Sequence, residues 1–251
     1  MLGHTGDGVA NARAVPRRYH QVIVGQDEVG PWTARFITYF PIASVVLFLL
    51  AVPHPRTRAL AYWIVMENKP VELATFMFLS AGGIIGLWVV LQGVRQREPL
   101  FVVAFYALFT AGVIFSAGEE VAWGQWFLHY RTPAWFEQVN AQHEVTFHNV
   151  RWLQGHSDFF RLAFGLGGVI GLLLDRWPAF RKIAVPRLLG AAVLTIASVS
   201  IVDTYEDFYP MQRTVSRAIF ESSEVIEMLI GFAALTYVWL NLRKLAAGWR
   251  A

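Results

Sequence analysis

Six long apolar stretches are the feature of this chain that most restricts its fold. Each one approaches the length of about 20 residues that an α-helix needs to cross the hydrocarbon core of a bilayer. The stretches lie at approximately 36–52, 71–94, 100–118, 159–174, 186–202 and 222–242. The sequence therefore predicts an all-α, polytopic membrane helix bundle with six transmembrane helices, and a helical outer segment between the third and fourth of them.

The composition agrees with a membrane protein and excludes several kinds of site. Hydrophobic residues make up 55% of the chain and charged residues only 16%, while the aromatic share of 15% suits a protein with two membrane–water interfaces. The chain has no cysteine, which excludes disulfides, thiolate metal sites and iron–sulfur clusters. The net charge of +3 comes from scattered basic residues and not from a basic patch, so no nucleic-acid partner is expected.

The distribution of lysine and arginine predicts the domain organisation and the orientation. Residues 1–30 read as a loosely ordered cytoplasmic leader, and residues 31–251 as a single transmembrane domain. Thirteen of the 21 basic residues fall in the leader and in the connections on the leader's side of the predicted bundle. Because basic residues resist translocation, both termini are expected to be cytoplasmic.

Acidic residues gather on the opposite side of the predicted bundle, although neither solubility nor insertion requires it. Five of the seven histidines accompany them. Antiparallel packing would bring these helix ends together into one polar region just below the outer lipid surface. The thirteen acids on this side, out of 18, are Glu67, Glu72, Glu119, Glu120, Glu137, Glu144, Asp158, Asp203, Glu206, Asp207, Glu221, Glu224 and Glu227.

Glu227 is the acid predicted to lie deepest in the membrane. At a rise of about 1.5 Å per residue it lies about 9 Å further inward than Glu221. An isolated ionised carboxylate is costly at that depth, so Glu227 must be neutral, paired or bound to a cation. Two interpretations stay open, a structural pair with Arg161 and a functional site.

Adjacent acids end the third apolar stretch, and a polar segment follows. Glu119 and Glu120 point about 100° apart on a helix, so only one can face the bundle axis, and Glu120 is the favoured one. Thr132 and Pro133 read as the cap and first turn of a short helix. If the chain is helical at Glu144 and His148, these two side chains share one face and can bind one metal ion.

These patterns define the candidate site. The predicted metal ligands are Glu120, Glu144, His148, Glu224 and Glu227. The predicted acid–base groups are Glu120, Glu227 and Asp203. The residues expected to support them are Glu119, Gln125, Asn140, Gln142, His143, Asn149, Arg161 and Glu206.

One string of residues resembles a known group of proteins. It runs Gly118-Glu119-Glu120, Trp123-Gly124-Gln125, Thr132-Pro133, and then Asn140, Gln142, Glu144, His148 and Asn149. It is similar to an element found in an uncharacterised group of bacterial multi-pass membrane proteins. The resemblance implies a shared element on the outer face and a location in the bacterial inner (plasma) membrane, and it implies no activity or ligand.

Three functions are open from the sequence. The first is a membrane-embedded, metal-dependent enzyme that oxidises or otherwise modifies a lipid or amphiphilic substrate. Oxygen ligands with one or two imidazoles suit iron or manganese, and zinc is a further option. The second is a proton- or cation-coupled transporter or channel subunit, and the third is a structural or assembly subunit that binds a partner protein. Oligomeric state does not follow from the sequence.

Overall fold

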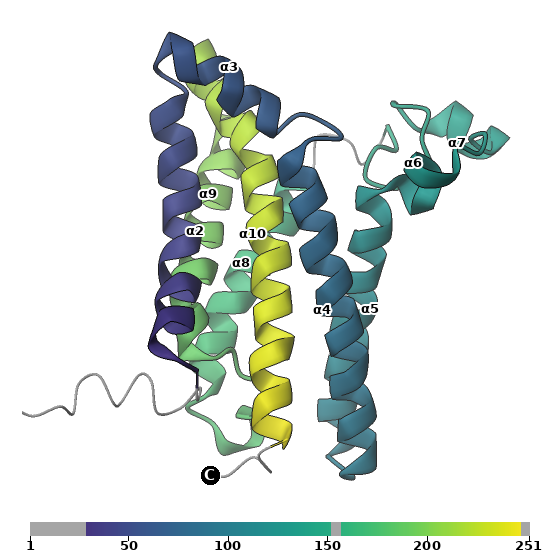
Figure 1. Cartoon of the computed structure of the whole chain (residues 1–251), viewed down its shortest axis with the longest axis vertical. Coiled ribbons are helices and arrows are strands. Elements are labelled where there is room, and N and C mark those ends of the chain that lie inside the picture. Colours follow the sequence, from purple (N-terminus) through teal and green to yellow (C-terminus); the bar gives the residue numbers. More distant parts are fainter. Residues whose placement is uncertain (1–28, 152–156, 247–251) are drawn as a thin grey trace, which may run out of the picture.

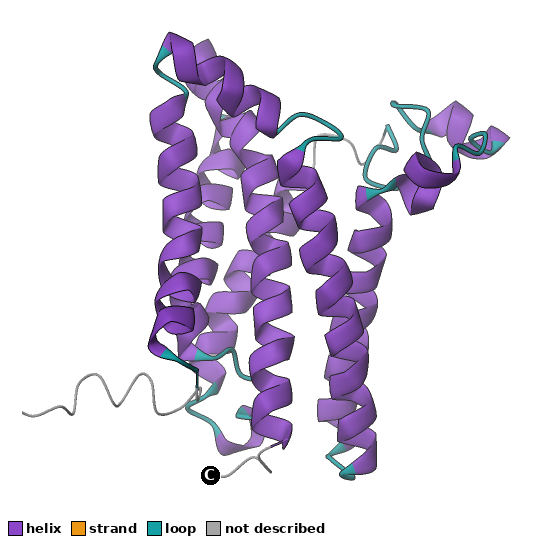
Figure 2. Cartoon of the chain, in the orientation of Figure 1, coloured by secondary structure: helices purple, strands orange, loops and turns teal. Residues whose placement is uncertain are grey.

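The computed structural model describes residues 29–151 and 157–246 of the chain. Within these ranges the regular structure is helical, with no strand (Figure 2). Six helices are long and apolar enough to cross a membrane, which confirms the predicted bundle. They are α2 (Pro31–Ala51), α4 (Pro70–Arg95), α5 (Leu100–Glu120), α8 (Ser157–Leu174), α9 (Gly190–Phe208) and α10 (Arg213–Ala246). Except for residues 29 and 30, the predicted leader (residues 1–30) lies outside the described residues.

The shorter helices connect the long ones at the two ends of the bundle. We call the end that carries α3 (Pro55–Ile64), α6 (Gln125–Leu128) and α7 (Ala134–Val139) the acidic end (Figure 1). The 3₁₀ turn η1 (Ala122–Gly124) is also there. The 3₁₀ turns η2 (Pro178–Phe180) and η3 (Arg187–Leu189) lie at the opposite end, where α2 begins and α10 ends.

Helix α10 is the centre of the bundle. It packs against α4 on one side and against α9 and α2 on the other, while α5 packs on α4 and α8 packs on α9 (Figure 1). Its side chains Leu229, Val238 and Leu240 are almost fully buried. The outer faces of the surrounding helices carry large exposed apolar side chains such as Leu87 and Leu108, as expected for surfaces that contact lipid.

The starts of three helices follow from proline. Pro31, Pro55 and Pro70 each occupy the first helical position, where the missing N–H has no intrahelical partner to lose. In α4, Glu72 lies in the first turn and Arg95 in the last turn, so both charges complement the helix dipole.

Helices α8 and α9 lie close together at Gly165. A Cβ atom added there would lie 2.7 Å from the backbone N and Cα of Ala197. We therefore expect Gly165→Ala to push the helices apart and to lower the free energy of unfolding by about 1–3 kcal/mol, measured by thermal unfolding in detergent. Gly167→Ala is the matched control, because no atom lies within 4 Å of its added Cβ. Equal effects of the two substitutions would contradict the close approach.

Candidate functional site

Four glutamates from three helices share the polar region at the acidic end. Glu72 lies on α4, Glu120 on α5, and Glu224 and Glu227 on α10. Each of the four lies within electrostatic reach of the other three. Their side chains are half-buried. We call these four residues the glutamate cluster.

Arg161 forms a buried fork between two other acidic side chains. Its Nη1 lies 2.8 Å from Oε1 of Glu227, and its Nη2 lies 2.7 Å from Oδ2 of Asp203. Nη1 also donates to the hydroxyl of Ser157, 2.9 Å away. The guanidinium thus joins α8, α9 and α10, and it forms with Glu227 the pair that was one of the two interpretations open from the sequence.

A further acid lies beside this fork. Asp158 is only 4% exposed, and neither of its carboxylate oxygens has a hydrogen-bond partner within residues 29–151 and 157–246. It lies within electrostatic reach of Asp203. Around the fork, three carboxylates face one cation: Arg161 pairs with Asp203 and Glu227, and Asp158 has no partner among the described residues. Like charges in such proximity repel unless a proton or a cation intervenes.

Glu119 is bonded to the segment that connects α5 to α8, residues 121–151, which we call the connecting segment. The chain turns sharply after α5, because Ala122, Trp123 and Gly124 all have positive φ angles. The indole of Trp123 folds back over Gly118, where a Cβ atom would lie 3.0 Å from the ring. Its Nε1 then donates to Oε1 of Glu119 at 2.6 Å.

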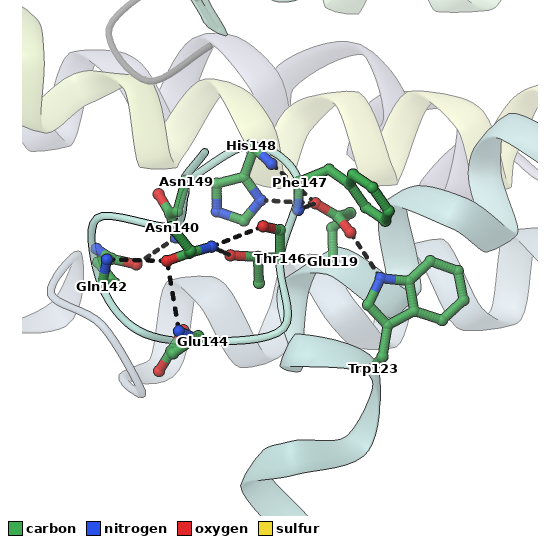
Figure 3. A network of polar contacts seen from close by, with 9 residues as sticks. All are labelled: Glu119, Trp123, Asn140, Gln142, Glu144, Thr146, Phe147, His148 and Asn149. Atoms are coloured by element: carbon green, nitrogen blue, oxygen red, sulfur yellow. Dashed lines mark hydrogen bonds and ion pairs between the residues drawn. The ribbon is translucent and has the colours of Figure 1, made fainter. Parts of the chain in front are cut away.

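The other oxygen of Glu119 accepts hydrogen bonds from the far end of the connecting segment (Figure 3). The backbone N–H of Phe147 donates to Oε2 at 2.6 Å, and that of His148 donates at 3.0 Å. The ring Nδ1 of His148 lies 3.2 Å from the same oxygen. Since a carboxylate only accepts, this contact places a ring proton on Nδ1.

His148 is therefore a histidine oriented by a carboxylate. Its side chain is 48% exposed. Partial burial opposes protonation, but the hydrogen bond with Glu119 and the charge of Glu227 outweigh it and raise the pKa of His148 above its usual value. An imidazole held in this way is suited to proton transfer or to metal binding.

Asn140 organises the rest of the connecting segment. Its side chain is fully buried, donates to the carbonyl of Thr146 at 2.7 Å and accepts from the backbone N–H of Gln142 at 2.8 Å (Figure 3). The side chain of Gln142 in turn bonds Glu67 and Asn149. These side-chain amides bond backbone groups that would otherwise form the hydrogen bonds of a helix. A short antiparallel bridge also joins Asn140 to Val150.

Two local expectations from the sequence about the connecting segment are wrong. Glu144 and His148 do not share a helix face, because the chain is irregular from residue 141 to residue 149. They still lie within electrostatic reach of each other. The short helix begins at Ala134 with Pro133 as its cap, and the hydroxyl of Thr132 donates instead to the carbonyl of His143.

The remaining predicted residues have separate roles. Gln125 uses its amide to tie Thr132 and Val145 to α6. His143 pairs with Glu137 on the surface, 3.6 Å apart, and Glu206 accepts from the backbone of Met211. Burial and the charge of Glu67 raise the pKa of Glu144.

The structure thus divides the predicted site into three parts. Glu120 and Glu224 belong to the glutamate cluster, Glu227 joins that cluster to Arg161 and Asp203, and His148 stands with Glu119. Glu72 belongs to the cluster but was not among the predicted site residues. Its position in the first turn of a helix is ordinary for an acid, which explains why it was not singled out.

No preformed metal site is present in the part of the chain that the structure describes, in the sense that no three histidine or acidic side chains already converge on one point. Comparisons of the chain with protein-family models, with characterised proteins and with solved structures find no match. The chemistry of the acidic end therefore has to be argued from its own side chains.

Proposed function

We propose that the glutamate cluster binds a divalent metal ion and that the protein is a membrane-embedded enzyme that modifies a lipid or another amphiphilic substrate at its acidic end. The observation that carries the proposal is the gathering of Glu72, Glu120, Glu224 and Glu227 from three helices within electrostatic reach of one another, with the Arg161 guanidinium bound to Glu227 of the four. Carboxylate oxygens and imidazole suit iron or manganese, and zinc is the next choice.

The free carboxylates of the cluster fit this role. The side chains of Glu120 and Glu224 make no hydrogen bond with any other described residue, so their carboxylates are available as ligands. Glu72 adds a third oxygen donor from α4, while one oxygen of Glu227 is occupied by Arg161. A ligating carboxylate set drawn from facing helices is the arrangement of helical-bundle metalloenzymes.

His148, which lies within electrostatic reach of Glu227, supports the same interpretation. Ligating or acid–base histidines usually donate their second ring N–H to a carboxylate, which fixes the tautomer and the ring orientation. Glu119 does this for His148, so Nε2 can take a proton from a substrate group or return one to it. A bound divalent metal would supply Lewis-acid chemistry, or redox chemistry if it is iron or manganese.

The core beneath the cluster favours an enzyme over a transporter. Leu79, Val113, Ala117 and Ala234 pack there into an apolar layer, with Phe164 from α8 against it. A transported ion would need polar groups through this layer. A site closed on its inner side and open at the acidic end instead suits a reaction with molecules of one membrane leaflet.

Elemental analysis of the protein, purified in mild detergent without chelator, tests the proposal. We expect about one or two equivalents of iron, manganese or zinc, as for carboxylate sites in helical bundles. The double substitution Glu120→Gln, Glu224→Gln should abolish metal binding, because it removes two anionic ligands without changing their size.

Glu221→Gln is the control for that experiment. Glu221 lies one turn before Glu224 on α10 but pairs with Arg217 at 3.4 Å, so its loss should leave the metal content unchanged. A folded wild-type protein that stays metal-free after incubation with each metal would refute the proposal, as would unchanged metal content in the double variant.

A further inference from the structure

A shallow polar pocket that is open to the surface, which we call the cavity, lies at the acidic end beside the glutamate cluster. Its volume is about 430 Å³. The backbone N–H of Asn68, on one wall, bonds the carboxylate of Glu72, so the cavity adjoins the cluster directly. The residues that line it are Asn68, Gln125, Trp126, His129, Tyr130 and Glu144.

The connecting segment holds the walls of this cavity in place. The amide of Gln125 donates to the hydroxyl of Thr132 at 2.9 Å and accepts from the backbone N–H of Val145 at 3.0 Å. The hydroxyl of Tyr130 donates to the carbonyl of Ala122 at 3.2 Å. The shape of the cavity is therefore built by side chains that cross between separate turns, and it does not depend on one mobile loop.

Several polar groups of the walls are left for a bound molecule. The side chains of Asn68 and His129 form no hydrogen bond or ion pair with the described residues. The indole N–H of Trp126 is buried and has no partner within those residues either. A buried donor without a partner usually indicates a missing water or ligand.

Apolar side chains flank the cavity on the side of the bilayer. Phe127 is 59% exposed and packs on Phe76 of α4, with the two ring centroids 6.1 Å apart. Leu128 is 75% exposed. Because both residues directly follow Trp126, they are placed to contact acyl chains while a polar headgroup occupies the cavity.

We propose that this cavity binds the headgroup of a zwitterionic, amine-bearing phospholipid as the substrate of the proposed enzyme. The ammonium group contacts the carboxylate of Glu144 and the aromatic rings of Trp126 and Tyr130. The phosphate oxygens accept hydrogen bonds from Asn68 and His129. The assignment of this lipid as a substrate rests on the proposed function, whereas its binding does not.

The charges around the cavity select the headgroup class. Glu144 lies within electrostatic reach of Glu67 and Glu72, and no lysine or arginine lines the walls. An anionic headgroup without an amine would meet this negative charge uncompensated. A headgroup that carries an ammonium beside its phosphate neutralises Glu144 and still satisfies the donors of Asn68 and His129.

Native mass spectrometry of the full chain in mild detergent tests the inference. With equimolar phosphatidylethanolamine and phosphatidylglycerol, we expect the wild type to retain the zwitterionic lipid about tenfold more often. Glu144→Gln should remove this preference, and Glu137→Gln, in the same segment but 56% exposed, should keep it. Equal retention of both lipids by the wild type, or an unchanged preference in Glu144→Gln, would overturn the inference.

Two further measurements are needed. One distinguishes a lipid ligand from a soluble one, and the other distinguishes lipid binding from the proposed enzyme function. Soluble glycerophosphoethanolamine should compete with the lipid only weakly, because it lacks the acyl chains that contact Phe127 and Leu128. Full competition would overturn the assignment to a lipid and leave a site for a soluble zwitterion. The metal content of the same sample reports on the glutamate cluster alone, so lipid preference without metal would refute the enzyme and leave lipid binding standing.

Discussion

Arg161→Met is expected to destabilise the bundle by about 3–5 kcal/mol, because it leaves two buried carboxylates without their cation. Asp203 and Glu227 are 15% and 31% exposed, and Arg161 itself is 10% exposed, so water replaces little of the lost interaction. Thermal unfolding in detergent, followed by tryptophan fluorescence, should show a fall in Tm of about 10 °C.

Two further variants test whether this effect comes from the lost ion pairs. Arg187→Met breaks a pair with Asp175 in which the arginine is 60% exposed, and it should change stability by less than about 1 kcal/mol. Adding Asp203→Asn and Glu227→Gln to Arg161→Met removes the uncompensated charges and should recover most of the loss. If Arg161→Met unfolds no earlier than Arg187→Met, the fork does not hold α8, α9 and α10 together.

Glu119→Ala is expected to release the connecting segment while the six long helices stay folded. The substitution removes the acceptor of the Trp123 indole and of the N–H groups of Phe147 and His148. Hydrogen bonds to a charged acceptor are worth about 1.5–3 kcal/mol each, and losing several should lower local stability by about 3 kcal/mol. Hydrogen exchange should therefore accelerate about a hundredfold in residues 140–150.

Glu137→Ala serves as the control for that experiment. Glu137 lies in the same segment, but its side chain is 56% exposed and pairs with the surface residue His143. Exchange in residues 140–150 should stay at the wild-type rate. Acceleration that spreads equally over α4, α5 and α10 in Glu119→Ala would show that Glu119 supports the whole bundle and not the segment.

The six membrane helices and the gathering of acids at one end could be predicted from the sequence. Both follow from features that one chain carries by itself, namely the length of apolar stretches and the position of charges at their ends. The same reasoning offered Arg161 as a partner of Glu227 beside the alternative of a functional site, because an ionised carboxylate at that depth requires compensation.

The interior of the connecting segment could not be predicted in the same way. A spacing of four between Glu144 and His148 has meaning only if the chain is helical there. Asn140 decides against a helix, because its buried amide bonds the backbone on both sides and competes with helical hydrogen bonds. Thr132 does not cap the short helix, because that helix begins at Ala134 with Pro133 as its cap, and the Thr132 hydroxyl bonds the carbonyl of His143.

Glu119 bonds the connecting segment while Glu120 belongs to the glutamate cluster, and this difference depends on the turn that follows them. Three successive residues with positive φ, two of them not glycine, end α5 and bring the Trp123 indole back to Glu119. Helical geometry predicts that the side chains of the two adjacent acids point in different directions. The turn after α5 determines that the Glu119 carboxylate bonds the connecting segment. Much of the string from Gly118 to Asn149 thus has a structural role in folding the connecting segment.

Anomalous X-ray scattering from crystals grown with Mn²⁺ tests the central claim most directly. The proposal predicts a strong manganese peak bounded by the carboxylates of Glu72, Glu120 and Glu224, at oxygen distances of about 2.2 Å. It would be contradicted if that position carried no peak and the three carboxylates instead shared protons with one another across direct hydrogen bonds.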